Sequence, residues 1–145
     1  MSNAMESYDN RRSVERYFEE AWNQGNIAAI DEIIAADFVG TMPPPNQPLR
    51  GPMGVKEFVT ADRLAYPDLH FTLEETVAEA NKVVARWTMR GTHLNQWKIF
   101  PPTGKSIEFC GVTIFTIKDS QIHRFFVISD ALGLLQQLGV LVIRS

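Results

Sequence analysis

The chain has 145 residues, a formal net charge of −3, a hydrophobic share of 45% and a charged share of 21%. These values are typical of one globular domain with a sizeable core, and they exclude wholesale disorder. Because the net charge is negative and Lys and Arg are scattered, no basic stripe is present to follow a phosphate backbone. We therefore expect no nucleic-acid partner.

The ends of the sequence and its single cysteine bear on where the protein acts. Residues 1–4 are interpreted as the remnant of an expression tag, so the domain is expected to span residues 5–145. No signal peptide is recognised, and each apolar run is far shorter than the roughly 20 residues that cross a bilayer. Cys110 lies within a strand pattern and is expected to be a buried, inert thiol. These features favour a cytoplasmic protein with no membrane partner.

The first half of the chain predicts three helices. Apolar residues recur at helical spacing over residues 8–24, and Gly25 and Asn26 are expected to end this helix. A second, shorter helix is predicted from an apolar stripe that runs from Ile27 to Phe38. Four prolines between residues 43 and 48 predict an extended loop, and a third helix is predicted to begin near Pro52.

The second half predicts a sheet, because the apolar period changes to two. Strands are expected near residues 69–74, 82–93, 106–118 and 122–129, with a short apolar helix over 131–138. Arg86 and Arg90 are expected to pair with Glu74 or Glu108 across this sheet. The order of elements predicts an α+β fold in which a curved, mainly antiparallel sheet wraps around the three helices.

The last strand is apolar on both faces. Phe125 and Val127 oppose Phe126 and Ile128, so one face is expected to pack on the helices and the other on a second copy of the chain. The sequence thus predicts a homodimer that forms through the sheet.

Asp130 is the candidate catalytic acid, because it ends this strand. Side chains alternate along a strand, so Asp130 shares one face with Phe126 and Ile128. A carboxylate in apolar surroundings is desolvated, which raises its pKa and suits it to proton transfer near neutral pH. The alternative is that Asp130 is the N-cap of the helix that follows. On the residues alone the two roles have equal weight, and one side chain can serve both.

Four segments in order resemble one known family: residues 66–71 (YPDLHF), 83–93 (VVARWTMRGTH), 101–105 (PPTGK) and 130–139 (DALGLLQQLG). Together they resemble the SnoaL-like polyketide cyclases and ester cyclases of the nuclear-transport-factor-2-like superfamily. The resemblance implies a cone-shaped α+β barrel with a pocket between the curved sheet and the helices. It also implies a small hydrophobic carbonyl compound as substrate.

The same resemblance implies a mechanism and a set of site residues. In such cyclases the Asp matched by Asp130 acts as general acid/base in an intramolecular aldol condensation, without a metal or an organic cofactor. His93 is expected as a possible helper, and its alternative is a hydrogen-bonded histidine at a strand end. Residues expected to form the apolar substrate wall are Trp22, Trp87, Trp97 and Phe126.

Two other functions remain open from the sequence. Family members commonly carry His-Trp or Glu-Trp shortly before the Asp, whereas this chain has Phe125-Phe126. A binding module that holds an apolar ligand without turnover, or a dimerisation domain, fits that difference. Tyr17 and Tyr66 resemble the tyrosine of ketosteroid-isomerase-like members; the alternatives are that Tyr17, at helical spacing, is a core residue and that Tyr66 is the residue before a proline. No zinc-ligand spacing is present, so no metal is expected.

Overall fold

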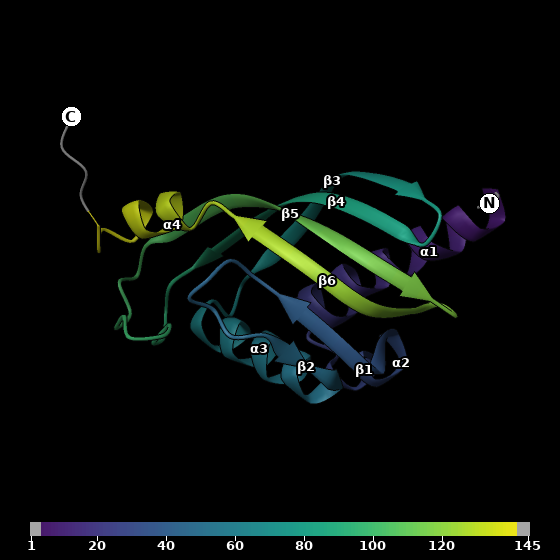
Figure 1. Ribbon diagram of the computed structural model, residues 1–145. Coiled ribbons are helices and arrows are strands. Elements are labelled where there is room, and N and C mark those ends of the chain that lie inside the picture. The colour runs from purple at the N-terminus through teal and green to yellow at the C-terminus, as the bar shows by residue number, and fades with distance from the viewer. Residues whose placement is uncertain (1–3, 142–145) are drawn as a thin grey trace.

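The structure is a computed structural model that describes residues 4–141, and it consists of a curved sheet with helices packed against its inner face (Figure 1). The helical elements are α1 (Ala4–Arg16), the π-helical turn η1 (Tyr17–Asn23), the 3₁₀ turn η2 (Ile27–Ala29), α2 (Ile30–Ile33), α3 (Gly51–Ala65) and α4 (Ala131–Gln137). The strands are β1 (Ile34–Thr41), β2 (Leu49–Arg50), β3 (His70–Glu79), β4 (Lys82–Thr92), β5 (Ser106–Lys118) and β6 (Gln121–Ser129). The predicted α+β class is confirmed.

The six strands form one sheet in the order β2-β1-β6-β5-β4-β3. Strand β1 runs parallel to β6, and the other pairs are antiparallel. The four long strands predicted from the sequence are all present. The mainly antiparallel sheet is therefore confirmed, and β1 and β2 extend it beyond β6.

The predicted second helix is confirmed over Ile27–Ile33 and wrong from Ile34 to Phe38. Helical structure stops at Ile33, and the chain continues as β1, which pairs with β6 from Ile34↔Ile122 onward. Ile30, Ile34 and Phe38 fit a spacing of four as well as the alternation of a strand. Pairing decides between the two structures, because without β1 the β6 edge would leave unpaired backbone groups.

The first helical segment ends as the sequence predicts, at Gly25, whose φ is +68°. Asn23 then fixes this end of the segment to the sheet. Its side-chain amide donates to the Phe71 carbonyl at 2.9 Å, and its side-chain oxygen accepts from the Phe71 N–H at 2.7 Å. From α3, Arg63 donates to the carbonyls of Trp22 and Asn23, which have no helical partner at a helix end. Helix, sheet and α3 are thus joined at one place.

The core lies between the inner face of the sheet and the helices. In β4 the alternate residues Val83, Ala85, Trp87 and Met89 are buried, as the period-two pattern predicts. They pack with buried side chains of the helical segments, such as Val14, Phe18, Val55 and Val59. Gly111 of β5 leaves room for the Trp87 indole, because a Cβ at this position would overlap it.

The outer face of the sheet carries ion pairs and exposed apolar side chains. Arg90 pairs with Glu108 at 2.9 Å, as expected, whereas Arg86 pairs with Glu75 at 2.8 Å rather than with Glu74. A register shift between Leu73 and Glu75 in β3 brings Glu75 opposite Arg86. Cys110 is also on this face and is exposed, so the prediction of a buried thiol is wrong.

None of the helices within residues 4–141 has the length and apolar character needed to cross a membrane.

Candidate functional site

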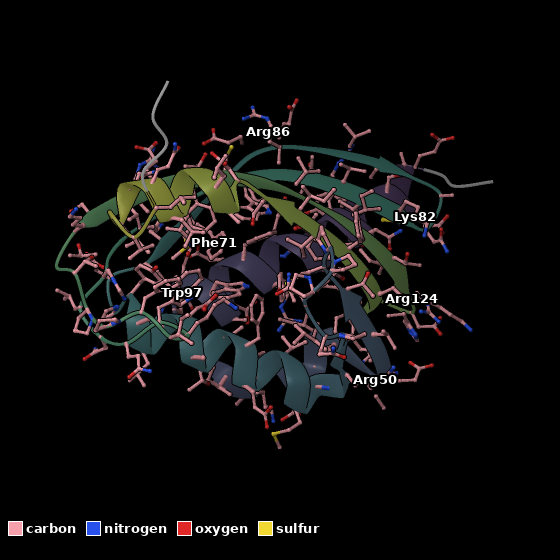
Figure 2. All side chains as sticks on the ribbon, turned by 60° about the vertical axis from the view of Figure 1, so that its left-hand side comes forward. Arg50, Phe71, Lys82, Arg86, Trp97 and Arg124 are labelled. Carbon is pink, nitrogen blue, oxygen red and sulfur yellow. The ribbon has the colours of Figure 1, made fainter. Side chains whose placement is uncertain are left out.

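A cavity of about 180 Å³ lies between the sheet, the η1 turn, α3 and the loop that follows β4. Its wall is mainly aromatic. The aromatic lining residues are Tyr17, Phe18, Trp22, Phe58, Phe71, Trp87, Trp97 and Phe109. Figure 2 shows Phe71 and Trp97 at the same end of the molecule, while Arg86 projects from the outer side of the sheet. An apolar pocket with few polar groups is the usual form of a small-molecule site.

Asp62 is the carboxylate of this cavity. It lies on α3 at the end of the stripe formed by Val55, Phe58 and Val59, and it lines the cavity wall. The Trp97 indole Nε1 donates a hydrogen bond to its Oδ1 at 3.2 Å. Burial raises the pKa of Asp62 from 3.8 to about 6, although the Trp97 hydrogen bond and the Lys98 charge lower it. A carboxyl group with such a pKa exchanges protons readily near neutral pH.

Tyr17 provides a hydroxyl group in the same cavity wall. Burial raises the pKa of Tyr17, and the negative charge of Asp62 raises it further, while a hydrogen bond with Trp22 lowers it. Because an indole N–H can only donate, the Tyr17 oxygen is the acceptor in that bond and its own proton remains available. Tyr17 therefore stays a neutral donor close enough to sense the charge of Asp62.

Lys98 is the other charged residue that lines the cavity. Its ammonium lies 5.3 Å from the centroid of the Trp97 ring, over the ring face. Lys98 is exposed and takes part in none of the ion pairs within residues 4–141, yet its charge is close enough to lower the pKa of Asp62. The cavity thus has a carboxylate and an ammonium that are separate rather than joined.

The loop that carries Trp97 and Lys98 is held in place by backbone hydrogen bonds. The N–H groups of Leu94 and Asn95 donate to the Ala65 carbonyl at the end of α3, at 3.0 and 3.3 Å. Trp97 and Phe100 bond each other through both backbone groups, at 2.9 and 2.8 Å. The loop therefore presents Trp97 to Asp62 from a fixed position.

Three of the four residues predicted for the substrate wall, Trp22, Trp87 and Trp97, line the cavity. Phe126 does not: it lies on the outer face of the sheet with 38% of its surface exposed. In β6 the cavity is lined by Val127 and Ser129, which belong to the opposite face. Phe126 is thus placed away from the substrate wall to which the sequence analysis assigned it.

Asp130 is exposed and does not line the cavity. Its Oδ1 accepts a hydrogen bond from the Gly133 N–H at 2.9 Å, which makes it the N-cap of α4. The apolar enclosure expected around this carboxylate is absent, because its face of β6 points outward. The capping alternative describes the observed contact, and the catalytic role of Asp130 stays a prediction.

His93 is fully buried but does not line the cavity. Its Nδ1 accepts from the Thr103 N–H at 3.2 Å and lies 3.0 Å from the Thr103 hydroxyl. The neutral ring therefore carries its proton on Nε2, which has no partner among the described residues. The hydroxyl of Tyr66 also has no hydrogen-bond partner among the described residues, and the Tyr66 ring centroid is 5.4 Å from that of His93. The helper role of His93 stays a prediction.

Sequence reasoning missed Asp62 although a signal was present. Val55, Phe58, Val59 and Asp62 occupy positions i, i+3, i+4 and i+7, so the acid continues the apolar stripe of α3. A carboxylate on the buried face of a helix marks an enclosed acid, whereas Asp130 stood out only through its position at a strand end.

Metal ligands do not converge in the described part of the chain: it contains no group of three or more His, Cys, Asp or Glu side chains placed to hold an ion.

Comparisons with known proteins agree with this geometry. A family model described as SnoaL-like polyketide cyclase matches residues 12–138. The chain belongs to this family. No curated protein matches the SnoaL-like chain.

Solved structures are similar over nearly the whole SnoaL-like chain. A candidate SnoaL-like polyketide cyclase from Jannaschia sp. CCS1 matches with a TM-score of 0.87 and 22% identity, over 98% of this chain and 99% of the other. This match shows the fold. A candidate polyketide cyclase from Acidithiobacillus ferrooxidans is 30% identical with a TM-score of 0.79, over 98% and 100% of the two chains. IdmH of Streptomyces antibioticus, also a candidate polyketide cyclase, is 28% identical with a TM-score of 0.79, over 90% and 98%.

Proposed function

We propose that this SnoaL-like protein transfers a proton to and from carbon in a small hydrophobic carbonyl compound, without a cofactor. The observation that carries the proposal is the Asp62 carboxylate, which lines an aromatic cavity and has a pKa of about 6. An acid–base group works best when its pKa is near the operating pH. Membership of a polyketide cyclase family supports the same class of reaction.

In the proposed reaction Asp62 removes a proton from the carbon next to the substrate carbonyl. The C–H electron pair moves to the carbonyl oxygen and gives an enolate, and the proton stays on the Asp62 carboxyl group. Tyr17 supports this step, because its free hydroxyl proton is available to the enolate oxygen. The enolate carbon then attacks a second carbonyl of the same substrate, which closes a ring, and the alkoxide formed there takes the proton from the Asp62 carboxyl group. If a C=C bond is conjugated with the enolate, Asp62 instead returns the proton to the far carbon of that system, which isomerises the substrate.

Deuterium exchange tests the proton-transfer step without knowledge of the natural substrate. Phenylacetone, a one-ring ketone with acidic benzylic protons, is incubated with the protein in D₂O at pH 7.5, and the loss of the benzylic signal is followed by NMR. We expect exchange above the buffer rate, and Asp62→Asn should reduce it about 100-fold or more. Asp130→Asn is the matched control, because it makes the same chemical change outside the cavity.

Each outcome of the exchange experiment decides between named assignments. If Asp130→Asn abolishes exchange while Asp62→Asn keeps it, Asp130 is the base and the proposal for Asp62 is wrong. If the parent protein binds phenylacetone but gives no exchange, the binding module without turnover is the better function. If it neither binds nor exchanges, the proposed class of carbonyl compound is wrong.

We also propose that the protein is a homodimer formed through the outer face of the sheet. Support comes from four apolar side chains on β5 and β6 that are exposed by 38–52% of their surface: Val112, Ile114, Phe126 and Ile128. Phe126→Glu should convert the dimer into a monomer in analytical ultracentrifugation, whereas Lys118→Glu, at the end of β5, should not. A parent protein that sediments as a monomer at tens of micromolar would refute this association.

A further inference from the structure

The charges and size of the cavity carry an inference about its ligand. This inference deepens the proposed function, because it concerns the substrate of the same site. Asp62 and Lys98 are the two charged residues among those that line the cavity, and the rest of the wall is mostly aromatic. A ligand that fills this space meets a carboxylate at one point and an ammonium at another.

We propose that the ligand is a one-ring aromatic or alicyclic keto acid, whose ring fills the aromatic cavity and whose carboxylate lies against Lys98. The acidic carbon of such a compound then faces Asp62.

The separation of the two charges supports an anionic ligand. The charge of Lys98 lowers the pKa of Asp62, but within residues 4–141 Lys98 forms no ion pair with Asp62 or with another carboxylate. Trp97 holds both groups, since its indole N–H binds Asp62 and its ring lies under Lys98 at 5.3 Å. Lys98 is exposed, so its ammonium attracts an anion as a surface cation does, and the attraction is screened by salt. Lys98 repels a cationic ligand whereas Asp62 attracts it, so the proposal requires the charged group of the ligand to lie nearer to Lys98 than to Asp62.

The volume of the cavity supports a ligand of one ring. An apolar cavity of about 150 Å³ holds one benzene molecule, and sites for drug-sized ligands run from about 300 to 1,000 Å³. The present cavity of about 180 Å³ therefore has room for one ring and a short chain. A ligand of three or four fused rings exceeds this volume and would have to extend out of the cavity.

Binding of three probes of matched shape tests the charge preference. The probes are 3-phenylpropanoate, the neutral 4-phenyl-2-butanone and 3-phenylpropylammonium, and binding is read from the fluorescence of the tryptophans that line the cavity. We expect the anion to bind at least about 5-fold more tightly than the ketone, and the ketone more tightly than the cation. The preference for the anion should shrink at 1 M salt, because ions screen the Lys98 charge.

Two variants assign the preference to Lys98. Lys98→Gln should remove the preference for the anion and leave binding of the neutral ketone within about 2-fold. Lys105→Gln, at the far end of the same loop and outside the cavity lining, is the matched control and should keep the preference. Circular dichroism of each variant checks that the fold is retained.

Several results would overturn the proposal. It is wrong if the ketone or the cation binds as tightly as the anion, if Lys98→Gln keeps the preference, or if none of the probes binds. It is also wrong if anthracene-2-carboxylate binds more tightly than 3-phenylpropanoate, because a three-ring ligand exceeds the cavity.

The proposed ligand class and the proposed reaction can be refuted independently of each other. If phenylacetone exchanges through Asp62 but no anion preference appears, the reaction stands and the keto-acid substrate is wrong. If the anion preference depends on Lys98 but the protein gives no exchange with phenylpyruvate, the site binds small acids and the proposed reaction is wrong.

Discussion

Asp62→Asn is expected to stabilise the protein at neutral pH. The enclosed carboxylate is kept in a cavity that disfavours its charged form, which is why its pKa is raised to about 6. Asparagine has the same shape and still offers an oxygen to the Trp97 indole N–H. The substitution therefore removes a partly buried charge while it keeps the hydrogen bond.

The size of this stabilisation follows from the pKa of Asp62. A folded-state pKa of about 6 against an ordinary value of 3.8 corresponds to about 3 kcal/mol of destabilisation when Asp62 is ionised. The hydrogen bond from Trp97 already lowers this pKa, so the preference of the indole N–H for the carboxylate is included in that figure. The expected gain in the free energy of unfolding is therefore about 3 kcal/mol at pH 7.5, or roughly 6–12 °C in Tm for a domain of this size.

The pH dependence distinguishes this cause from a general packing effect. Because the folded-state pKa is raised, the folded protein favours the protonated acid. The contribution of this acid to the free energy of unfolding is fully present below about pH 4. It is lost as the pH rises from about 4 through 6. Urea unfolding of parent and variant at several pH values should show a difference of about 3 kcal/mol at pH 7.5 that falls below about 1 kcal/mol at pH 4.

Asp119→Asn makes the same change in an exposed turn and should alter stability by less than about 0.5 kcal/mol at each pH. The reasoning about Asp62 is refuted if Asp62→Asn destabilises the protein at pH 7.5. It is also refuted if the difference between variant and parent does not change between pH 4 and pH 7.5.

Three further substitutions test contacts around the site. Asp130→Ala should remove the N-cap of α4 and lower the Tm by roughly 2–4 °C for a loss of about 1 kcal/mol, whereas Asp130→Ser should retain most of it; equal melting curves for the alanine variant and the parent would contradict the cap. Asn23→Ala should cost about 2 kcal/mol in urea unfolding, because both backbone groups of Phe71 lose their partner. Thr113→Val should cost about 1–3 kcal/mol, because the buried Trp87 indole N–H loses its acceptor at 2.9 Å; Thr113→Ser keeps the hydroxyl, so an equal loss in both variants would assign the effect to packing.

The sequence by itself determined the parts of this protein that depend on local patterns. The strand over residues 106–118 was predicted with the bounds that the structure has, because alternation over many residues defines one conformation. The stop at Gly25 was predictable because glycine accepts the left-handed conformation found there. The structure of short runs that fit two periods, such as Ile30 to Phe38, was not predictable, because the pairing partner β6 lies far away in the sequence.

The site depended on tertiary structure at two points. Both faces of β6 are apolar, so the pattern alone does not tell which face packs on the helices, and that choice puts Val127 inside and Asp130 outside. The enclosure of Asp62 requires the loop after β4 to fold back onto the end of α3, which brings Trp97 to an acid 35 residues earlier in the chain. Residue types and spacing set which faces are apolar, whereas long-range packing decides which carboxylate is shielded from solvent.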